Sequence, residues 1–169
     1  MAAQGLTGWV SHTRPRARGA PRVTKTRMFF VSEVVRFCYG HRLLDYVGKC
    51  ARVHGHNGKV EIVLASASLD RTGFVVDFHD VEAAALRFID ETFDHRLLLR
   101  RDDPLIPALE AANEPFVALD VNPSAENLAK LVFDHLQTSG LPVYEVRFFE
   151  TETSVAVYRG APEPAATDR

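Results

Sequence analysis

The stretch Cys50–His56, which reads Cys-Ala-Arg-Val-His-Gly-His, places one thiol and two imidazoles at the start of an expected β-strand. Because successive side chains of a strand point to opposite faces, His54 and His56 leave on the same face and can bind one ion together. A third imidazole, His41, follows an earlier apolar run and would complete three nitrogen ligands with one coordination position open, as in catalytic zinc sites. Each histidine alone fits an ordinary surface or core position. Their combination with Cys50 favours a metal site.

Two β-branched and aromatic runs flank this stretch and predict the strands that carry it. The first covers residues 28–37, with His41 just past its end. The second covers residues 59–66, where apolar and polar side chains alternate. We expect a long antiparallel hairpin with the candidate ligands at one end, and a loop over residues 42–53 that brings Cys50 next to the metal.

Apolar residues at helical spacing predict two amphipathic helices downstream. The first ends near Phe93, directly before Asp94 and His95. The second begins at Ser124 as N-cap and ends at Gly140. Three prolines make residues 100–119 an expected loop, and residues 143–149 and 154–158 read as two last strands. The predicted order is β-β-α-α-β-β, an α+β fold with an antiparallel sheet and both helices on one face.

Composition indicates one globular, soluble domain, with 46% apolar and 25% charged residues in a chain of 169. No apolar run approaches the roughly 18 residues that a membrane helix needs. Two cysteines cannot build a disulfide framework, so we expect a reducing, cytoplasmic environment. Of the two, Cys50 is assigned to chemistry, and Cys38 is interpreted as a packing residue.

Charge is distributed unevenly along the chain. Residues 1–27 hold six Lys and Arg residues and no acid, which leaves 14 bases against 22 acids, a net charge of −8, for residues 28–169. An acidic body argues against broad nucleic-acid binding. Residues 1–27 lack apolar periodicity, so we expect a disordered basic extension, either translated from an upstream start or used as a transit peptide. The folded domain is expected over residues 28–160, with a disordered tail over 161–169.

Six motifs in register resemble the 6-pyruvoyl-tetrahydropterin synthase family, and most closely its bacterial 6-carboxy-tetrahydropterin synthases. The resemblance spans roughly residues 29–160. Its motifs are Phe37-x-x-x-His41-x-Leu43, Cys50-x-x-x-His54-Gly55-His56, Val76-Asp77-Phe78, Phe93-Asp94-His95-x-x-Leu98, Asn122-Pro123-Ser124-x-Glu126-x-Leu128-Ala129, and Glu150-Thr151 followed by Tyr158. One departure lies beside the first candidate ligand, where the family usually has small residues and this chain has Tyr39-Gly40.

The resemblance implies the tunnelling fold (T-fold), in which subunits join their sheets into a barrel, usually a hexamer of two trimers with active sites between subunits. It implies a zinc-dependent lyase that converts 7,8-dihydroneopterin triphosphate to 6-carboxy-5,6,7,8-tetrahydropterin, acetaldehyde and triphosphate, for queuosine synthesis. Two alternatives stay open. One is a 6-pyruvoyl-tetrahydropterin synthase of tetrahydrobiopterin synthesis, which stops after triphosphate elimination, and the other is a non-catalytic metal-binding protein of the same fold.

The resemblance also implies a role for each candidate residue. His41, His54 and His56 are implied as Zn²⁺ ligands, Cys50 as the proton-abstracting base, Asp94 and His95 as the partners that relay its proton, Glu150 as the pterin anchor, and Ser124 and Thr151 as substrate contacts. Plainer readings exist for several of them. The Asp94-His95 pair could cap a helix, Glu150 could be an edge-strand charge, and Cys50 could be a small buried filler.

Overall fold

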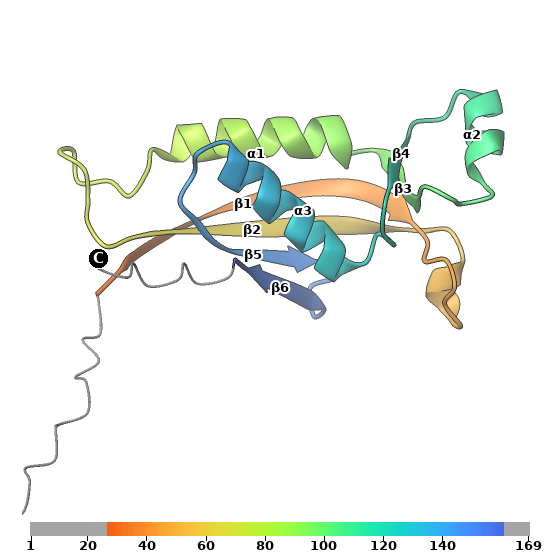
Figure 1. Ribbon diagram of the computed structural model, residues 1–169, viewed down its shortest axis with the longest axis horizontal. Coiled ribbons are helices and arrows are strands. Elements are labelled where there is room, and N and C mark those ends of the chain that lie inside the picture. Colours follow the sequence, from red (N-terminus) through yellow and green to blue (C-terminus); the bar gives the residue numbers. More distant parts are fainter. Residues whose placement is uncertain (1–26, 161–169) are drawn as a thin grey trace, which may run out of the picture.

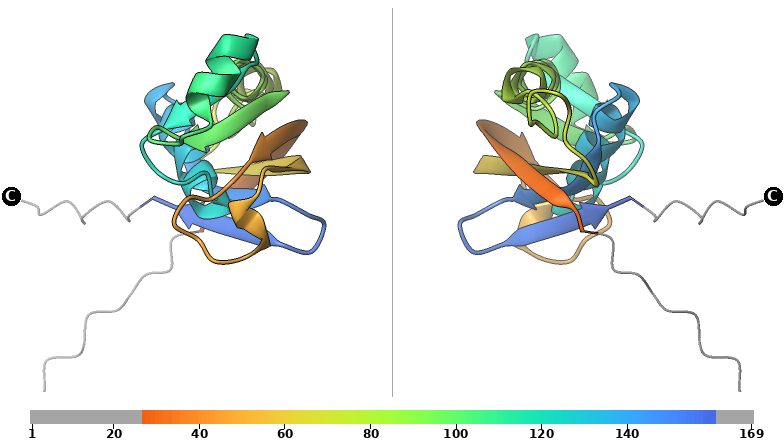
Figure 2. Two further views of the ribbon diagram at one scale, coloured as in Figure 1. Left: turned by 90° about the vertical axis from the view of Figure 1, so that its right-hand side faces the viewer. Right: turned by 90° about the vertical axis from the view of Figure 1, so that its left-hand side faces the viewer.

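A computed structural model describes residues 27–160, so the expectations for residues 1–26 and 161–169 lie outside the described part. The described chain forms one curled six-stranded sheet in the order β4-β3-β1-β2-β5-β6, with helices packed on it (Figures 1 and 2). Its elements are β1 (Phe29–His41), a 3-10 turn (Lys49–Ala51), β2 (His54–Ser66), α1 (Phe78–Thr92), β3 (Arg96–Arg100), α2 (Ile106–Ala112), β4 (Phe116–Leu119), α3 (Ala125–Thr138), β5 (Val143–Phe149) and β6 (Val155–Arg159).

The β1–β2 hairpin is the longest feature of the sheet, and its antiparallel register runs without interruption from Phe29 opposite Ser66 to His41 opposite His54. Both strands are therefore longer than predicted, because β1 continues past residue 37 and β2 begins before residue 59. The added residues include Gly, His and Asn, which have weak strand propensity. Pairing with the opposite strand, which is not visible in local sequence, holds them in the ladder.

The structure of residues 96–119 shows that two predictions were wrong, namely the expected loop and the purely antiparallel sheet. The segment expected to be mostly loop contains α2 and β4, and β3 precedes it. Both strands pair in parallel, β3 with β1 and β4 with β3, so the sheet is mixed and the described fold has three helices instead of two. The prolines stand where helices and strands tolerate them, since Pro107 lies in the first turn of α2 and Pro115 directly precedes β4.

Helices α1 and α3 cover one face of the sheet, as predicted (Figure 1). Helix α1 packs on β1 and helix α3 on β5 and β6. Asp77 caps α1 by accepting a hydrogen bond from the His79 amide, and Ser124 caps α3 by accepting one from the Asn127 amide. Gly140, with a φ of 84°, follows the last residues of α3 and ends it, as predicted.

The apolar core lies between these helices and the sheet and includes Phe37, Ile62, Phe93, Val132 and Phe148. Alternation along β1 decides which side chains reach it, because the odd-numbered residues from Val35 to His41 are buried, whereas the even-numbered residues Arg36 and Cys38 are exposed on the other face. No helix in residues 27–160 is long and apolar enough to cross a membrane.

Candidate functional site

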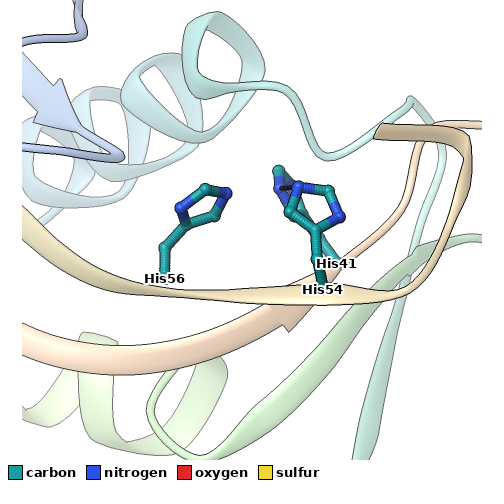
Figure 3. A group of neighbouring side chains, drawn as sticks. All are labelled: His41, His54 and His56. Carbon is teal, nitrogen blue, oxygen red and sulfur yellow. Dashed lines mark hydrogen bonds between the residues drawn. The ribbon is translucent and has the colours of Figure 1, made fainter. Parts of the chain in front are cut away.

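Three imidazoles gather where β1 ends and β2 begins (Figure 3). His41 and His54 are register partners, and His56 lies two residues further along β2 on the same face. The ring centroids are 4.5 Å apart for His41 and His54, and 5.0 Å for His56 with each of the others. One nitrogen from each ring lies within 4.8 Å of the other two. The hairpin thus brings the predicted ligands together.

Backbone carbonyls fix the tautomers of two of these rings. The Nδ1 of His41 lies 2.7 Å from the Pro123 carbonyl oxygen, and the Nδ1 of His54 lies 2.7 Å from that of Arg52. A carbonyl oxygen only accepts, so each Nδ1 carries the proton and each Nε2 offers a lone pair. Metal-binding histidines are held in this way by a second shell of acceptors.

The Nε2 atoms of His41 and His54 face each other at a distance of 3.1 Å. Neither of them carries a proton in these tautomers, so their lone pairs repel unless a cation lies between them. The Nε2 of His56 is also buried, and it has no hydrogen-bond partner among residues 27–160. Imidazole nitrogens bind zinc at about 2.0–2.1 Å, which places two tetrahedral ligands about 3.3 Å apart. The observed spacing fits a shared ion.

Burial favours the neutral, metal-binding form of His41 and His56. The side chain of His41 is 2% exposed, and this burial, with the neighbouring His54 and His56, lowers its pKa to about 4 against the opposing effect of the Pro123 carbonyl. Burial also lowers the pKa of His56, although the charge of Glu150 opposes the shift. Three neutral imidazoles suit zinc and other borderline divalent ions such as copper, iron and nickel.

A cavity of about 220 Å³ lies beside the imidazoles. Its lining includes Cys50, Ser124 and Glu150, all predicted from the sequence, together with Ser154, which was not predicted. Cys50 reaches it from the 3-10 turn, and its carbonyl accepts a hydrogen bond of 2.8 Å from the Leu43 amide, which ties the loop back to β1. The Glu150 carboxylate lies 3.9 Å from the Nε2 of His41.

Thr151 does not line this cavity. Its Oγ1 accepts hydrogen bonds from the Ser154 amide at 3.0 Å and from the Thr153 amide at 3.3 Å, which closes the turn between β5 and β6. The residue therefore shapes the segment that carries Glu150. Side-chain hydroxyls of threonine commonly close turns in this manner.

Asp94 and His95 lie elsewhere, at the end of α1. The two oxygens of the Asp94 carboxylate accept hydrogen bonds of 2.8 Å, one from the Cys38 amide and one from the Nδ1 of His95. These bonds lower the pKa of Asp94 although burial opposes the shift. The His95 amide donates to the Cys38 carbonyl at 2.7 Å. The pair, here named the Asp94–His95 dyad, is thus fixed to β1 at Cys38.

Cys38 and His95 line two cavities of about 460 Å³, one of which also includes Asp94, and neither cavity includes Cys50 or the three histidines. The His95 side chain is 79% exposed, and its backbone has a φ of 55°, which is costly for a residue with a Cβ. Cys38 is exposed as well, which corrects its interpretation as a packing residue, and its thiol donates to Asn57 Oδ1 at 3.3 Å.

Sequence reasoning missed the second shell of this site. The Pro123 and Arg52 carbonyls that orient His41 and His54 are backbone groups, so residue type carries no sign of them. Only the Asn122-Pro123-Ser124 motif pointed to that loop. Tyr39, whose ring contacts two of the histidines, was noticed as a departure without an assigned role.

Comparisons with known proteins agree on one family. The family model described as 6-pyruvoyl tetrahydropterin synthase matches residues 31–161. The 6-carboxy-5,6,7,8-tetrahydropterin synthase of Rickettsia conorii is 32% identical over 73% of this chain and 88% of its own length. The protein of the same name from Aquifex aeolicus is 32% identical over 76% of this chain and 96% of its own.

A solved structure shows the same fold. The 6-pyruvoyl tetrahydropterin synthase of Caenorhabditis elegans superposes with a TM-score of 0.60 at 24% identity, over 82% of this chain and all of that one. The mixed sheet with its helices on one face is therefore the fold of these synthases. The chain belongs to the 6-pyruvoyl tetrahydropterin synthase family.

Proposed function

We propose that this protein is a zinc-dependent lyase that converts 7,8-dihydroneopterin triphosphate to 6-carboxy-5,6,7,8-tetrahydropterin, acetaldehyde and triphosphate, a step toward queuosine and related 7-deazaguanines. The protein is a lyase of its family, and the bacterial relatives that cover most of its length carry the 6-carboxy name. The observation that carries the proposal is the cluster of three imidazoles, with His41 lining the same cavity as Cys50 and Glu150.

His41, His54 and His56 hold the zinc ion in this proposal. When bound, the ion supplies Lewis-acid chemistry that makes side-chain hydroxyls of a substrate easier to deprotonate. Cys50 lines the adjoining cavity and acts as the base that takes a proton from the substrate side chain. Cysteine is suited to this role because thiolates form most readily near cations.

In this proposal, Glu150 recognises the pterin ring of the substrate by hydrogen bonds. A pterin ring offers adjacent N–H and amino donors, and a carboxylate can accept from both in a bidentate pair. Glu150 is one of two carboxylates that line the cavity beside His41, and the other is Glu126 at the start of α3. Ser124 lines the same cavity and can contact the ring, and Thr151 contributes by closing the turn that follows Glu150.

The Asp94–His95 dyad enters the proposal from a second subunit. Within one chain it lies beside Cys38, whose side chain points away from the buried face of β1, and the cavity with Cys50 contains His41 from that buried face. An imidazole backed by a carboxylate and exposed at its other nitrogen is suited to pass a proton to a partner. We therefore propose that the dyad of one subunit serves Cys50 of its neighbour.

This arrangement requires a homo-oligomer. The strands β4 and β6 are the edges of the described sheet, and edge strands present unpaired backbone groups that can join another sheet. Edge-to-edge joining of curled sheets produces the closed barrel of the tunnelling fold. We propose a hexamer of two trimers, in which the active sites form between subunits.

Product identification tests the proposed function. The zinc-loaded protein is incubated with 7,8-dihydroneopterin triphosphate, the pterin product is identified by its mass, and acetaldehyde is trapped as a hydrazone. We expect 6-carboxy-tetrahydropterin and acetaldehyde in equal amounts, and no turnover after chelation until zinc is restored. Release of triphosphate with a 6-pyruvoyl product and no acetaldehyde would favour the tetrahydrobiopterin alternative. Absence of any turnover would favour a non-catalytic metal-binding protein.

A further inference from the structure

Arg36 and Lys59 carry like charges at directly opposite positions of the β1–β2 hairpin. They are register partners, so their Cβ atoms lie about 4.5–5.5 Å apart on one face of the sheet. Like charges at such positions destabilise a strand pair. Within the part of the chain that the structure describes, neither side chain forms an ion pair, and the acids further along this face, Glu61 and Glu145, are paired with Arg147. The positive charge of the pair is therefore left uncompensated.

These two cations line a cavity of about 460 Å³ together with the Asp94–His95 dyad. The Lys59 ammonium lies 3.8 Å from the centroid of the Phe149 ring, an attraction that leaves its hydrogen-bond donors free. The Asp94 carboxylate is already bonded to the Cys38 amide and to His95. Glu152, exposed in the turn between β5 and β6, is the other acid that lines the cavity. The cavity thus presents an arginine and a lysine beside the proposed proton relay.

The cavity beside the imidazoles has the opposite character. Its lining includes the carboxylates Glu126 and Glu150, and no Arg or Lys among the described residues. A triphosphate carries several negative charges, so these two carboxylates would repel it. The cations that bind the triphosphate end of the proposed substrate must therefore come from elsewhere. The proposed function already brings the dyad of a neighbouring subunit to this cavity, and Arg36 and Lys59 of that neighbour come with it.

We propose that Arg36 and Lys59 bind the triphosphate group of the substrate, so that the subunit that supplies the dyad also supplies the cationic half of the binding site. This inference rests on the proposed function and on its site shared between subunits. The planar guanidinium of Arg36 can donate two parallel hydrogen bonds to a phosphate, and the Lys59 ammonium adds a second positive charge. A phosphate that contacts both side chains also offsets the repulsion between them.

The test is calorimetric titration of the zinc-loaded protein with inorganic triphosphate, with zinc content measured before and after. Arg36→Gln and Lys59→Gln should each weaken triphosphate binding about 10- to 100-fold, because each removes a charge-assisted hydrogen bond. Added salt should weaken binding to the wild type more than to the double variant, since salt screens the charges that the variant lacks. Arg71→Gln and Arg87→Gln, at exposed arginines outside this cavity, are the matched controls and should bind triphosphate as the wild type does.

Two further titrations separate a binding role from a structural one. Glu152→Gln removes a negative charge from the same cavity and should tighten triphosphate binding, by up to about fivefold for an exposed charge. Biopterin, a pterin without phosphate, should bind the Arg36 and Lys59 variants as it binds the wild type.

The outcomes of these titrations bear separately on the inference and on the proposed function. Unchanged triphosphate affinity in the double variant, or equal losses of triphosphate and biopterin affinity, would overturn the inference and leave the proposed function intact. Absence of triphosphate binding to the wild type would do the same. Failure of the wild type to bind biopterin, with triphosphate binding that still depends on Arg36 and Lys59, would instead count against the proposed function and leave the anion site standing.

Discussion

At the scale of single residues, His41 is the most deeply buried of the three candidate ligands. It is buried at the end of β1, and its ring is held by the Pro123 carbonyl. Its folded pKa of about 4 lies below the ordinary value of 6.5, so between these values the unfolded chain binds a proton that the folded chain does not. The stability of the metal-free protein should therefore be complete above pH 6.5 and decrease as the pH falls toward 4.

The size of this effect follows from the shift, since one pKa unit corresponds to about 1.4 kcal/mol. We expect the metal-free protein to lose about 2 kcal/mol of its free energy of unfolding between pH 7 and pH 5, measured by urea denaturation. His41→Gln should remove this part of the slope, while His79→Gln, at an exposed histidine, should keep it. Identical pH slopes for the wild type and His41→Gln would contradict the account of His41.

The two cysteines allow a matched comparison at the residue scale. Cys50→Ser should keep the zinc and the fold but lose about 10²- to 10⁴-fold in turnover, because general base catalysis contributes this much. Cys38→Ser changes the exposed thiol on the other face and should turn over within a few-fold of the wild type, since the dyad is bonded to the Cys38 backbone. The measurement is the steady-state rate of each variant with dihydroneopterin triphosphate. Equal losses of rate in both variants would exclude a special role for Cys50.

At the scale of single elements, α3 connects the fold to the site. Ser124 caps this helix and also lines the cavity beside the imidazoles, and Pro123 directly before it orients His41. Ser124→Ala should therefore cost about 1 kcal/mol in free energy of unfolding, measured by urea denaturation. Ser124→Asp should restore most of that stability because Asp also caps, and Ser32→Ala, on an exposed strand position, serves as control. No loss in Ser124→Ala would show that the cap contributes little.

The sequence predicted those helices and strands whose formation depends on neighbouring residues in the chain. The apolar spacing of α1 and α3, the Ser124 cap and the strand β5 were all visible in sequence. The strands β3 and β4 were not, because they are five and four residues long and pair in parallel with distant partners. The ends of β1 and β2 were missed for a related reason, since pairing across the hairpin holds residues of weak strand propensity in place.

The candidate site was also predictable in part, where it depends on the spacing of residues within the hairpin. Spacing and strand alternation predicted that the three histidines converge, and the structure confirms it. The placement of the dyad on the opposite face could not be predicted from position in the chain, because it depends on how the end of α1 meets Cys38. The second-shell carbonyls depend on tertiary contacts for the same reason.

At the scale of the whole molecule, the described chain holds two halves of one proposed active site that do not meet. The imidazoles, Cys50 and Glu150 are on one side of the sheet, and the Asp94–His95 dyad is on the other. An enzyme built from these parts has to form its site between two copies. This shared site is the central claim of our account, and it can be tested without knowing the size of the oligomer.

Complementation between two inactive variants tests that claim most directly. Cys50→Ser and His95→Ala are produced separately and also together in one cell, and turnover of dihydroneopterin triphosphate is measured at equal protein concentration. Each variant alone should be nearly inactive. Random mixing pairs an intact Cys50 with an intact neighbouring dyad in about one quarter of the interfaces, so the co-produced protein should recover about a quarter of wild-type activity. Activity no greater than the mean of the two separate variants would contradict a site shared between subunits.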